Sequence, residues 1–368
     1  MQTCLDRRDD VIVCLSDEGP LVEQLQSIGA RVRILNLAIL RKGYFTLTGI
    51  LNRAVLFQVA VVRLAIIILL EKIDLVYSNT VAVLVGLFAA KITRRHHVWH
   101  VHEIIYSPRI VHVTLKSLMK ESDLNIFVSS QCRNCWSDGS DAGQVVLHNG
   151  LDLTRFKMTR PAHRKELGVG DDIVVIGMVG RVHYWKGQEY FLKIASSLSQ
   201  KYHDLLFVLV GDAFPGYEYL YQRIERLISQ LGLNSKVINL GYRTDVPNLL
   251  AMFDIFVLPS ILPDPLPTTV LEAMACSKPV VATAHGGVLE MVVEGETGLF
   301  IPYDSAEDAA EILGPLVQSK ALRISMGKRG KQRVEEHFSL AKFKSGLVAL
   351  IQPFESNGYR YREVQKPL

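Results

Sequence analysis

Residues 255–283 read IFVLPSILPDPLPTTVLEAMACSKPVVAT, and this stretch predicts the fold class of the chain. Two short apolar runs, Ile255–Leu258 and Pro279–Thr283, have the length of buried strands, and Val270–Cys276 between them has helical character. A strand, a helix and a second strand in this order form parallel strands of one sheet. We therefore predict an α/β fold.

The same alternation of apolar runs with helical segments extends in both directions. Further strands are predicted at Val11–Leu15, Arg31–Leu35, Asp74–Ser78, His97–Val101, Asn125–Ser129, Ile173–Val179, Leu205–Val210, Lys236–Leu240 and Gly298–Ile301. A turn-rich break at His148–Asp152 interrupts the pattern, and 368 residues suffice for two domains. We expect two doubly wound Rossmann-like domains, 1–155 and 156–340, which face each other across a cleft, and a tail, 341–368, that packs back on the first.

Composition narrows the classes of function. The net charge is only +4 and no long Lys or Arg run is present, so a nucleic-acid partner is not expected. The polar segment Met1–Asp10 is not typical of a secretion signal. The five cysteines, which include Cys132 and Cys135, lack zinc spacing and suit a reducing cytoplasm. Because the apolar run Ala54–Leu70 contains Arg63, we expect a buried crossover helix rather than a membrane span.

Known nucleotide motifs are absent from the sequence. Neither the G-x-G-x-x-G of dinucleotide-binding dehydrogenases nor the G-x-x-x-x-G-K-[ST] phosphate loop occurs. The loop Gly180–Gly187, GRVHYWKG, instead carries Arg181 and Lys186, which can converge on one anionic group after the first strand of the second half. The alternative is a pair of solvated loop cations.

A stiff, proline-rich loop leads into the helix of the opening stretch. Pro267 suits the first helical turn, where its missing N–H is not needed. The free backbone N–H groups of Thr268, Thr269 and Val270 would then favour a pyrophosphate at the positive end of the helix dipole. Glu272 lies one turn further on, where its carboxylate can accept hydrogen bonds from sugar hydroxyls. The alternative for Glu272 is an acid that complements the helix dipole.

Two further segments follow strands. Gly286 and Gly287 allow either close approach to a ligand or simply a tight turn. In the first half, HVWHVHE at 97–103 places His100 and His102 on one face of a strand, with Glu103 next to them. Histidine transfers protons near neutral pH, so acceptor binding or catalysis is predicted. A structural role and a metal site are the alternatives, although no further ligands stand at zinc spacing.

The combination of GRVHYWKG, PDPLPTTVLEAMACSKPVVAT, HGGVLEMVVEGETGLF and HNGLD resembles family 4 of the retaining GT-B glycosyltransferases. The resemblance implies that Arg181 and Lys186 hold a donor diphosphate. It also implies that Asp264 and Glu272 are the two acids of an E-x7-E motif, which contact the transferred sugar and the ribose. The candidate sites are therefore a catalytic pair (His102 and Asp264), a donor site (Arg181, Lys186, Gly187, Thr268, Thr269, Glu272, Gly286 and Gly287) and an acceptor site (His100 and Glu103).

Two departures from the family pattern have consequences. Asp264 stands where the family has Glu, which shortens the reach by roughly 1.5 Å and predicts a modest shift in donor preference. Family members usually begin with a strand and a glycine-rich turn before the strand that Val11–Leu15 matches, but only Met1–Asp10 precedes it here. We expect the first domain to lack this strand, which leaves sheet edges unpaired.

The implied reaction is transfer of a hexosyl group from a nucleotide-diphosphate sugar to an acceptor hydroxyl, with retention, in polysaccharide or glycolipid synthesis. The sequence has no Asp-x-Asp, so neither a metal nor another cofactor is expected, and cations would stabilise the departing diphosphate. One alternative is a nucleotide-sugar-binding homologue that the missing strand has left without catalysis. Another is a UDP-sugar 2-epimerase of the same fold, which would need a cluster of acids that we do not find.

The expected partners are the nucleotide-sugar donor and a carbohydrate or lipid-linked acceptor. Between Gln24 and Leu70 six Arg or Lys residues occur without an acid, among apolar residues that include Tyr44 and Phe45. Such a face suits an anionic membrane surface, and a solvated face over a buried helix is the alternative. The expected location is the cytoplasm, with attachment to the inner face of the membrane as a further hypothesis.

Overall fold

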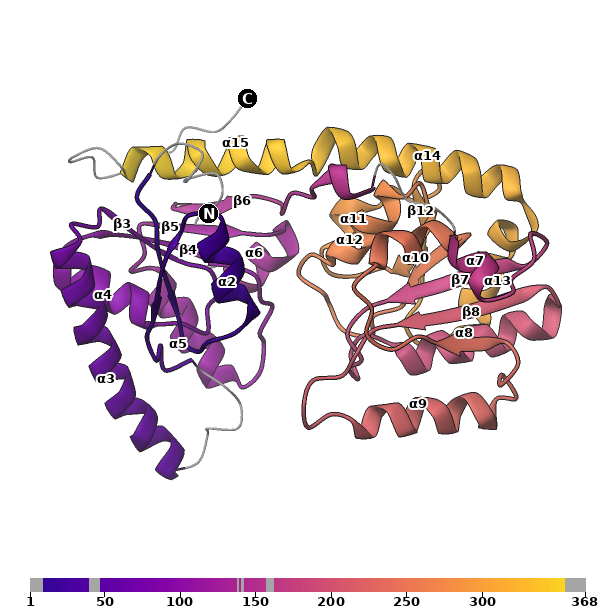
Figure 1. Ribbon diagram of the computed structural model, residues 1–368, viewed down its shortest axis with the longest axis horizontal. Helices are drawn as coiled ribbons and strands as arrows, with labels where there is room; N and C mark the ends of the chain where they lie inside the picture. The colour runs from indigo at the N-terminus through magenta and orange to yellow at the C-terminus, as the bar shows by residue number, and fades with distance from the viewer. Residues whose placement is uncertain (1–8, 40–46, 138, 140–141, 157–161, 355–368) are drawn as a thin grey trace. The chain divides into compact units, whose positions relative to one another are not determined.

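The computed structural model describes residues 9–39, 47–137, 139, 142–156 and 162–354, and within these ranges all paired strands run parallel (Figure 1). The predicted α/β class is therefore confirmed. The chain forms two compact units, one of Met1–His148 with Phe343–Leu368 and one of Asn149–Lys342. The chain thus passes between the units at His148 and Lys342, whereas the sequence pattern placed the boundaries at residues 155 and 340.

The second unit contains a six-stranded sheet in the order β12-β11-β10-β7-β8-β9. Its strands are β7 (Val174–Val179), β8 (Leu205–Val210), β9 (Val237–Asn239), β10 (Ile255–Leu258), β11 (Val280–Thr283) and β12 (Gly298–Ile301). Its helical elements are η2 (Leu153–Phe156), α7 (Ala162–Glu166), α8 (Gln188–Lys201), α9 (Tyr219–Gln230), α10 (Val246–Met252), α11 (Thr268–Ala275), α12 (Val288–Met291), α13 (Ala306–Gln318) and α14 (Lys320–His337). All six strands predicted for this half are present.

Helices cover the two faces of this sheet. Helix α8 packs against α9 and α13, while α11 packs against α10 and α14. Figure 1 shows α8 and α9 on one side of the sheet and α10, α11 and α12 on the other. Strands β10 and β11 are buried along their whole length, so their sequences IFVL and VVAT are continuously apolar or small rather than alternating.

The first unit contains two parallel sheets, β1-β2 and β3-β4-β5-β6. Its strands are β1 (Ile12–Leu15), β2 (Arg31–Ile34), β3 (Leu75–Ser78), β4 (His96–Val101), β5 (Leu124–Phe127) and β6 (Gln144–Val146). Its helical elements are α2 (Pro20–Ser27), α3 (Leu47–Leu70), α4 (Val85–Thr93), α5 (Arg109–Met119), α6 (Ser130–Trp136), the part of α15 (Leu340–Ile351) from Phe343 onward, and η3 (Gln352–Phe354). Strand β6 was not predicted, because its three residues are too few to form a recognisable apolar run.

No strand joins the two sheets within the residues that the structure describes for this unit. Strands β1 and β2 pair in register from Ile12 opposite Arg31 to Leu15 opposite Ile34, and β3 pairs only with β4. The expected loss of the central strand stays a prediction. The segment 1–8, which that expectation also concerned, lies outside the described residues.

The apolar run predicted as a buried crossover helix forms α3, but only one of its faces is buried. The buried face packs in a core cluster with β2–α3 loop residues and α4, through Ala60, Val61, Leu64, Ala65 and Ile68. The opposite face is 44% to 60% exposed at Val55, Val59, Val62, Ile66 and Leu69. The prediction of a buried helix is therefore wrong for this second face.

The C-terminal segment contributes to the core of the first unit. Leu347, Ile351 and Phe354 are buried against Val98 and Ile126 of the four-stranded sheet. Burial of these side chains makes the segment part of the unit rather than an appendage. Residues 355–368 of the predicted tail lie outside the described residues.

Candidate active site

Three loops of the second unit meet at one edge of its sheet. They follow β7, β10 and β11, which are neighbours in the strand order, so their carboxyl ends lie side by side. Backbone hydrogen bonds join them directly: Ile261 N–H donates to the Trp185 carbonyl at 2.8 Å, and Gly287 N–H donates to the Asp264 carbonyl at 2.7 Å. The topology therefore brings together three segments that are widely separated in the sequence.

Lys186 and Asp264 form an ion pair at this edge. Their side chains are only 15% and 12% exposed, so both charges are largely removed from water. Breaking a buried pair by removing one partner leaves an uncompensated charge and costs about 3–5 kcal/mol. Lys186, which was predicted to bind the diphosphate, and Asp264, which was predicted to contact the transferred sugar, are thus paired with each other in this structure.

Arg181 is exposed on the same loop and stacks on an aromatic ring. Its guanidinium carbon lies 3.7 Å from the centre of the Phe214 ring, in the loop after β8. Partial burial lowers the pKa of Arg181, which stays far above neutrality because an arginine starts so high. The ring orients the cation without neutralising it. Phe214 was missed because its loop has no charge pattern that marks it.

Gly187 is needed for packing in its loop. Its φ is +84°, and a Cβ placed there would lie 1.9 Å from the Pro259 carbonyl oxygen. Only glycine tolerates both conditions. A glycine is therefore required at this position because the loop of Arg181 and Lys186 lies against the end of β10.

Helix α11 begins at Thr268, with Pro267 at the preceding cap position rather than inside the first turn. Val270 N–H donates to the Pro267 carbonyl at 3.0 Å, so the prediction that this amide is free is wrong. The helix dipole and the first-turn amides of Thr268 and Thr269 remain as the groups that can attract an anion.

Glu272 lies half-buried one turn along the same helix. Burial raises the pKa of Glu272, and both Arg155 and a hydrogen bond with the Thr268 side chain oppose that rise. Arg155 lies on η2, which contacts α11. Sequence reasoning did not find Arg155, because its proximity to Glu272 arises only from the packing of two distant elements.

The glycine pair after β11 packs against the loop of Asp264. The φ of Gly286 is +74°, and a Cβ there would lie 2.4 Å from the Asp264 carbonyl oxygen. A Cβ on Gly287 would lie 2.1 Å from the Pro265 carbonyl oxygen. The close approach of these glycines is therefore to the protein's own backbone, as the alternative of a tight turn predicts, and the ligand contact stays a prediction. These glycines position Asp264.

The histidine segment of the first unit divides into buried and partly exposed groups. His100 is only 2% exposed, and its Nδ1 lies 2.7 Å from the Tyr77 hydroxyl. Burial lowers the pKa of His100 to about 3. The expectation that His100 contacts an acceptor is corrected, because a side chain within the core has no surface for one. His102 is half-buried, and the centres of its ring and the His100 ring lie 4.2 Å apart, as a shared strand face predicts.

Glu103 is engaged within the protein. Its carboxylate accepts hydrogen bonds from the Thr80 hydroxyl, from Val81 N–H at 3.3 Å and from His102 N–H at 3.1 Å. Burial raises the pKa of Glu103, and these hydrogen bonds oppose the rise. These hydrogen bonds give Glu103 a structural role that joins the segments after β3 and β4, and its predicted acceptor contact stays a prediction.

No group of three His, Cys, Asp or Glu side chains in the described ranges could hold a metal ion. Cys132 and Cys135 are buried on α6, and neither forms a disulfide. The metal alternative for the histidine segment therefore finds no ligand set there.

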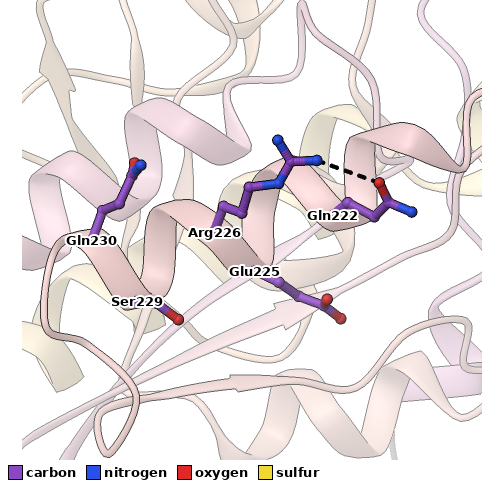
Figure 2. Close-up of a pocket in the computed structure, with 5 residues that line it drawn as sticks. All are labelled: Gln222, Glu225, Arg226, Ser229 and Gln230. Carbon is purple, nitrogen blue, oxygen red and sulfur yellow. Dashed lines mark hydrogen bonds between the residues drawn. The ribbon is translucent and has the colours of Figure 1, made fainter.

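A surface hollow along α9 is separate from the predicted site (Figure 2). It is lined by five side chains of this one helix, and Arg226 donates to Gln222 at 3.4 Å. The lining residues are Gln222, Glu225, Arg226, Ser229 and Gln230. None of the predicted site residues lies among them, and a single helix face supplies no converging groups, so the hollow is not taken as the active site.

The second unit is similar to a known protein family. Residues 159–333 match the family model described as glycosyl transferases group 1. Spore coat protein SA of Bacillus subtilis is 26% identical over 220 residues, 56% of this chain and 58% of that protein. A GDP-mannose-dependent monoacylated alpha-(1-6)-phosphatidylinositol monomannoside mannosyltransferase of Corynebacterium glutamicum is 30% identical over 251 residues, 65% of this chain and 64% of that protein. The chain thus spans less than two thirds of the length of either relative.

The fold likeness extends over nearly the whole chain. The crystal structure of Anabaena Alr3699/HepE in complex with UDP and glucose has a TM-score of 0.82 and 25% identity, and it covers 95% of this chain and 94% of that one. Both units are therefore found in a solved relative that binds a nucleotide.

Proposed function

We propose that the chain is a group 1 glycosyltransferase of the GT-B fold and that it transfers a hexosyl group from a nucleotide-diphosphate sugar to an acceptor hydroxyl, with retention. The observation that carries the proposal is the buried pair of Lys186 and Asp264, next to Arg181 and the N-terminus of α11. The product would be part of a polysaccharide or glycolipid.

A donor diphosphate would explain why Arg181 and Lys186 lie at this edge of the sheet. Its oxygens would replace Asp264 as the partner of Lys186. They would also accept hydrogen bonds from the Arg181 guanidinium and from the first-turn N–H groups of α11. Asp264, released from the ion pair, would accept a hydrogen bond from a hydroxyl of the transferred sugar. Binding of the complete donor thus exchanges one charge partner for another within a site of low exposure, which limits the desolvation cost.

The chemical step then follows from where negative charge develops. The bond between the anomeric carbon and the diphosphate oxygen breaks, and Lys186 with Arg181 stabilises the charge on the departing oxygen. The acceptor hydroxyl bonds to the anomeric carbon on the face that the diphosphate leaves, and its proton passes to the leaving oxygen. His102 is proposed to lie near the reacting sugar. No metal enters this scheme, because side chains and the helix N-terminus supply the positive charge.

A donor panel tests the proposal. The chain is titrated with UDP-, GDP- and ADP-sugars, and transfer and hydrolysis are followed with and without a chelator. We expect one nucleotide class to bind, Lys186→Ala to abolish this binding, His102→Ala to retain it, and the chelator to have no effect. Lys193→Ala, an exposed lysine on α8, is the matched control.

The alternatives predict different outcomes of the same panel. Binding without turnover would identify a nucleotide-sugar-binding homologue, and interconversion of UDP-sugar epimers without an acceptor would identify an epimerase. Loss of transfer on chelation would contradict the metal-free scheme.

We further propose that the first unit attaches to an anionic membrane in the cytoplasm, where it would meet a lipid-linked acceptor. The support is the exposed stripe on α3, formed by Val55, Val59, Val62, Ile66 and Leu69. On α4, which packs against α3, Phe88 and Ile92 are 36% and 66% exposed. By length and composition Asn52–Leu70 could cross a membrane, with a mean hydropathy of 2.3. Because its other face packs in the protein core, a surface helix fits better.

Apolar contact outweighs charge in this proposal. Arg31 pairs with Asp10 and Glu71, which removes part of the expected basic face, and Arg41 and Lys42 lie outside the described residues. Arg63 remains exposed on α3. Burying the exposed part of each stripe side chain contributes on the order of 1 kcal/mol, so the five together exceed the roughly 1 kcal/mol of one cation near anionic lipid.

Vesicle flotation tests the attachment. We expect the chain to float with anionic vesicles, to be retained in part at high salt, and to lose binding in the V62E/I66E double variant. Ile324→Glu, at an exposed residue of α14, is the control. The alternating spacing of four and three residues along the stripe also suits a helix–helix seam. No flotation, together with a dimer that the double variant dissociates, would assign the stripe to a second copy instead.

A further inference from the structure

Asn79 and His102 lie at the ends of neighbouring strands. Strand β3 pairs with β4 in parallel, with Ser78 opposite Trp99, so the segments that leave both strands begin at the same edge. The Asn79 Oδ1 atom lies 3.1 Å from Nε2 of His102. Nothing in the sequence pattern marks Asn79, because the contact depends on the register of two strands.

The two segments are fixed to each other independently of this contact. The carboxylate of Glu103, next to His102, accepts from the Thr80 hydroxyl and from Val81 N–H, next to Asn79. Trp99 Nε1 donates to the Thr80 carbonyl at 2.7 Å. The backbone of Asn79 is therefore held in place by its neighbours, and only its side chain is committed to the histidine.

The chain is also fixed after His102. Trp136 Nε1 donates to the Glu103 carbonyl at 2.8 Å, and Cys132 Sγ lies 3.3 Å from the same oxygen. Both residues lie on the buried α6 side of the unit. A substitution of the exposed Asn79 side chain thus leaves this frame intact.

We propose that Asn79 is a positioning residue that fixes the ring orientation and the tautomer of His102. In this arrangement Nε2 carries the proton and donates a hydrogen bond to the Asn79 amide oxygen. Nδ1 is then the acceptor for a substrate hydroxyl. The role of His102 beside the reacting sugar rests on the proposed function, but the tautomer does not.

The surroundings of His102 favour its neutral form. The titratable groups near it are His100 on β4, the adjacent Glu103, and Tyr77 on β3, which bonds to His100. Burial lowers the pKa of His102 below its ordinary value. The Asn79 amide oxygen accepts a hydrogen bond from Nε2–H without adding charge, whereas a carboxylate at the same place would favour the imidazolium.

Long-range proton–nitrogen NMR of the full chain, with nitrogen-labelled histidine, reads tautomer and pKa directly. We expect the Nε2–H form in the native protein and a mixture of tautomers in Asn79→Leu. Asn79→Asp should keep the Nε2–H form and raise the pKa of His102 by roughly one unit. Asn52→Asp, on α3, is the control with the same chemical change. An Nδ1–H form in the native protein, or no change in Asn79→Leu, would overturn the proposal.

The pH profile of transfer separates this inference from the proposed function. If the chain transfers sugar, the acidic limb of kcat in Asn79→Asp should move up with the pKa of His102 while the KM for the donor stays unchanged. A limb that does not follow the measured pKa would overturn the positioning role. A chain without activity would contradict the proposed function and leave the tautomer result standing.

Discussion

At the scale of residues, Asp264, which stands where the family that the chain resembles has Glu, forms a largely buried ion pair with Lys186. The two loops that carry the pair follow adjacent strands, β7 and β10, so the short carboxylate already reaches the cation. The pair also implies a competition, since the donor diphosphate that we propose to bind Lys186 would seek the same ammonium group as Asp264.

Asp264→Asn should therefore have opposite effects on stability and on nucleotide binding. Without its partner the largely buried Lys186 charge is uncompensated, and the loss of stability should be about 3–5 kcal/mol in the free protein. UDP or the preferred nucleoside diphosphate should bind several-fold more tightly, because its competitor is gone, while sugar transfer falls. Calorimetric titration and thermal unfolding measure the two effects.

The matched control is Asp264→Glu, which keeps the charge and restores the longer acid of the family pattern. It should retain the free-state stability to within about 1 kcal/mol. Equal nucleotide affinity in the native protein and Asp264→Asn would show that the two anions do not compete for Lys186.

At the scale of elements, strand β4 buries two histidines without charging them. His97 lies between hydroxyls, with Nε2 3.0 Å from Ser78 Oγ and Nδ1 2.9 Å from Ser122 Oγ. Burial lowers the pKa of His97 to about 4 and that of His100 to about 3. Because both histidines are buried in the neutral form, the stability of the fold around this strand should depend on pH.

The first unit should lose stability on acidification. The pKa of each histidine is lower in the folded than in the unfolded chain, so the unfolded chain binds more protons as the pH falls below about 6.5. The stability is complete above that pH and should fall by about 1.4 kcal/mol per pH unit for each histidine, until roughly pH 4 for His97. Urea unfolding at pH 7 and pH 5, followed by tryptophan fluorescence, measures the slope.

Variants assign the slope to the strand. His100→Gln should reduce the pH dependence even if it lowers the stability at pH 7, because it removes one titrating group. His203→Gln, an exposed histidine of the second unit, should leave the dependence unchanged. An undiminished slope in His100→Gln would contradict the assignment.

At the scale of the whole molecule, the residues of the proposed reaction are divided between the two compact units. The residues proposed for the donor lie in the second unit, and the histidine segment lies in the first. Among the residues that the structure describes, the sheets and buried core clusters of one unit share no strand or cluster with those of the other. A ligand that contacts one unit should therefore stabilise that unit first.

A nucleoside diphosphate should raise the unfolding temperature of the second unit alone. At a concentration of 100 times Kd the expected stabilisation is about 2.7 kcal/mol. Scanning calorimetry would resolve two transitions, and amide exchange should slow in the loop of Lys186 and the first turn of α11 but not in β1 or β2. Equal shifts of both transitions would show that the nucleotide binds the units as one body.

Much of the fold could be predicted from local pattern. Buried parallel strands such as β10 are continuous apolar runs, and a helix between two of them leaves few alternatives for the topology. Strand β6 escaped prediction because three residues carry no period. The exposed face of α3 was not predicted, because the sequence of an apolar helix is the same whether or not its second face packs against protein.

The sequence by itself determined the class of the fold, the order of the predicted strands along the chain and the loops that we propose to bind the donor, because apolar periodicity and loop residues are local properties. Only the tertiary structure decided which of those residues meet. It paired Lys186 with Asp264, moved His100 into the core, turned Gly286 toward the protein's own backbone and brought Asn79 to His102. Such contacts depend on strand order and register, and these are set by the burial of the whole sheet rather than by any segment of it.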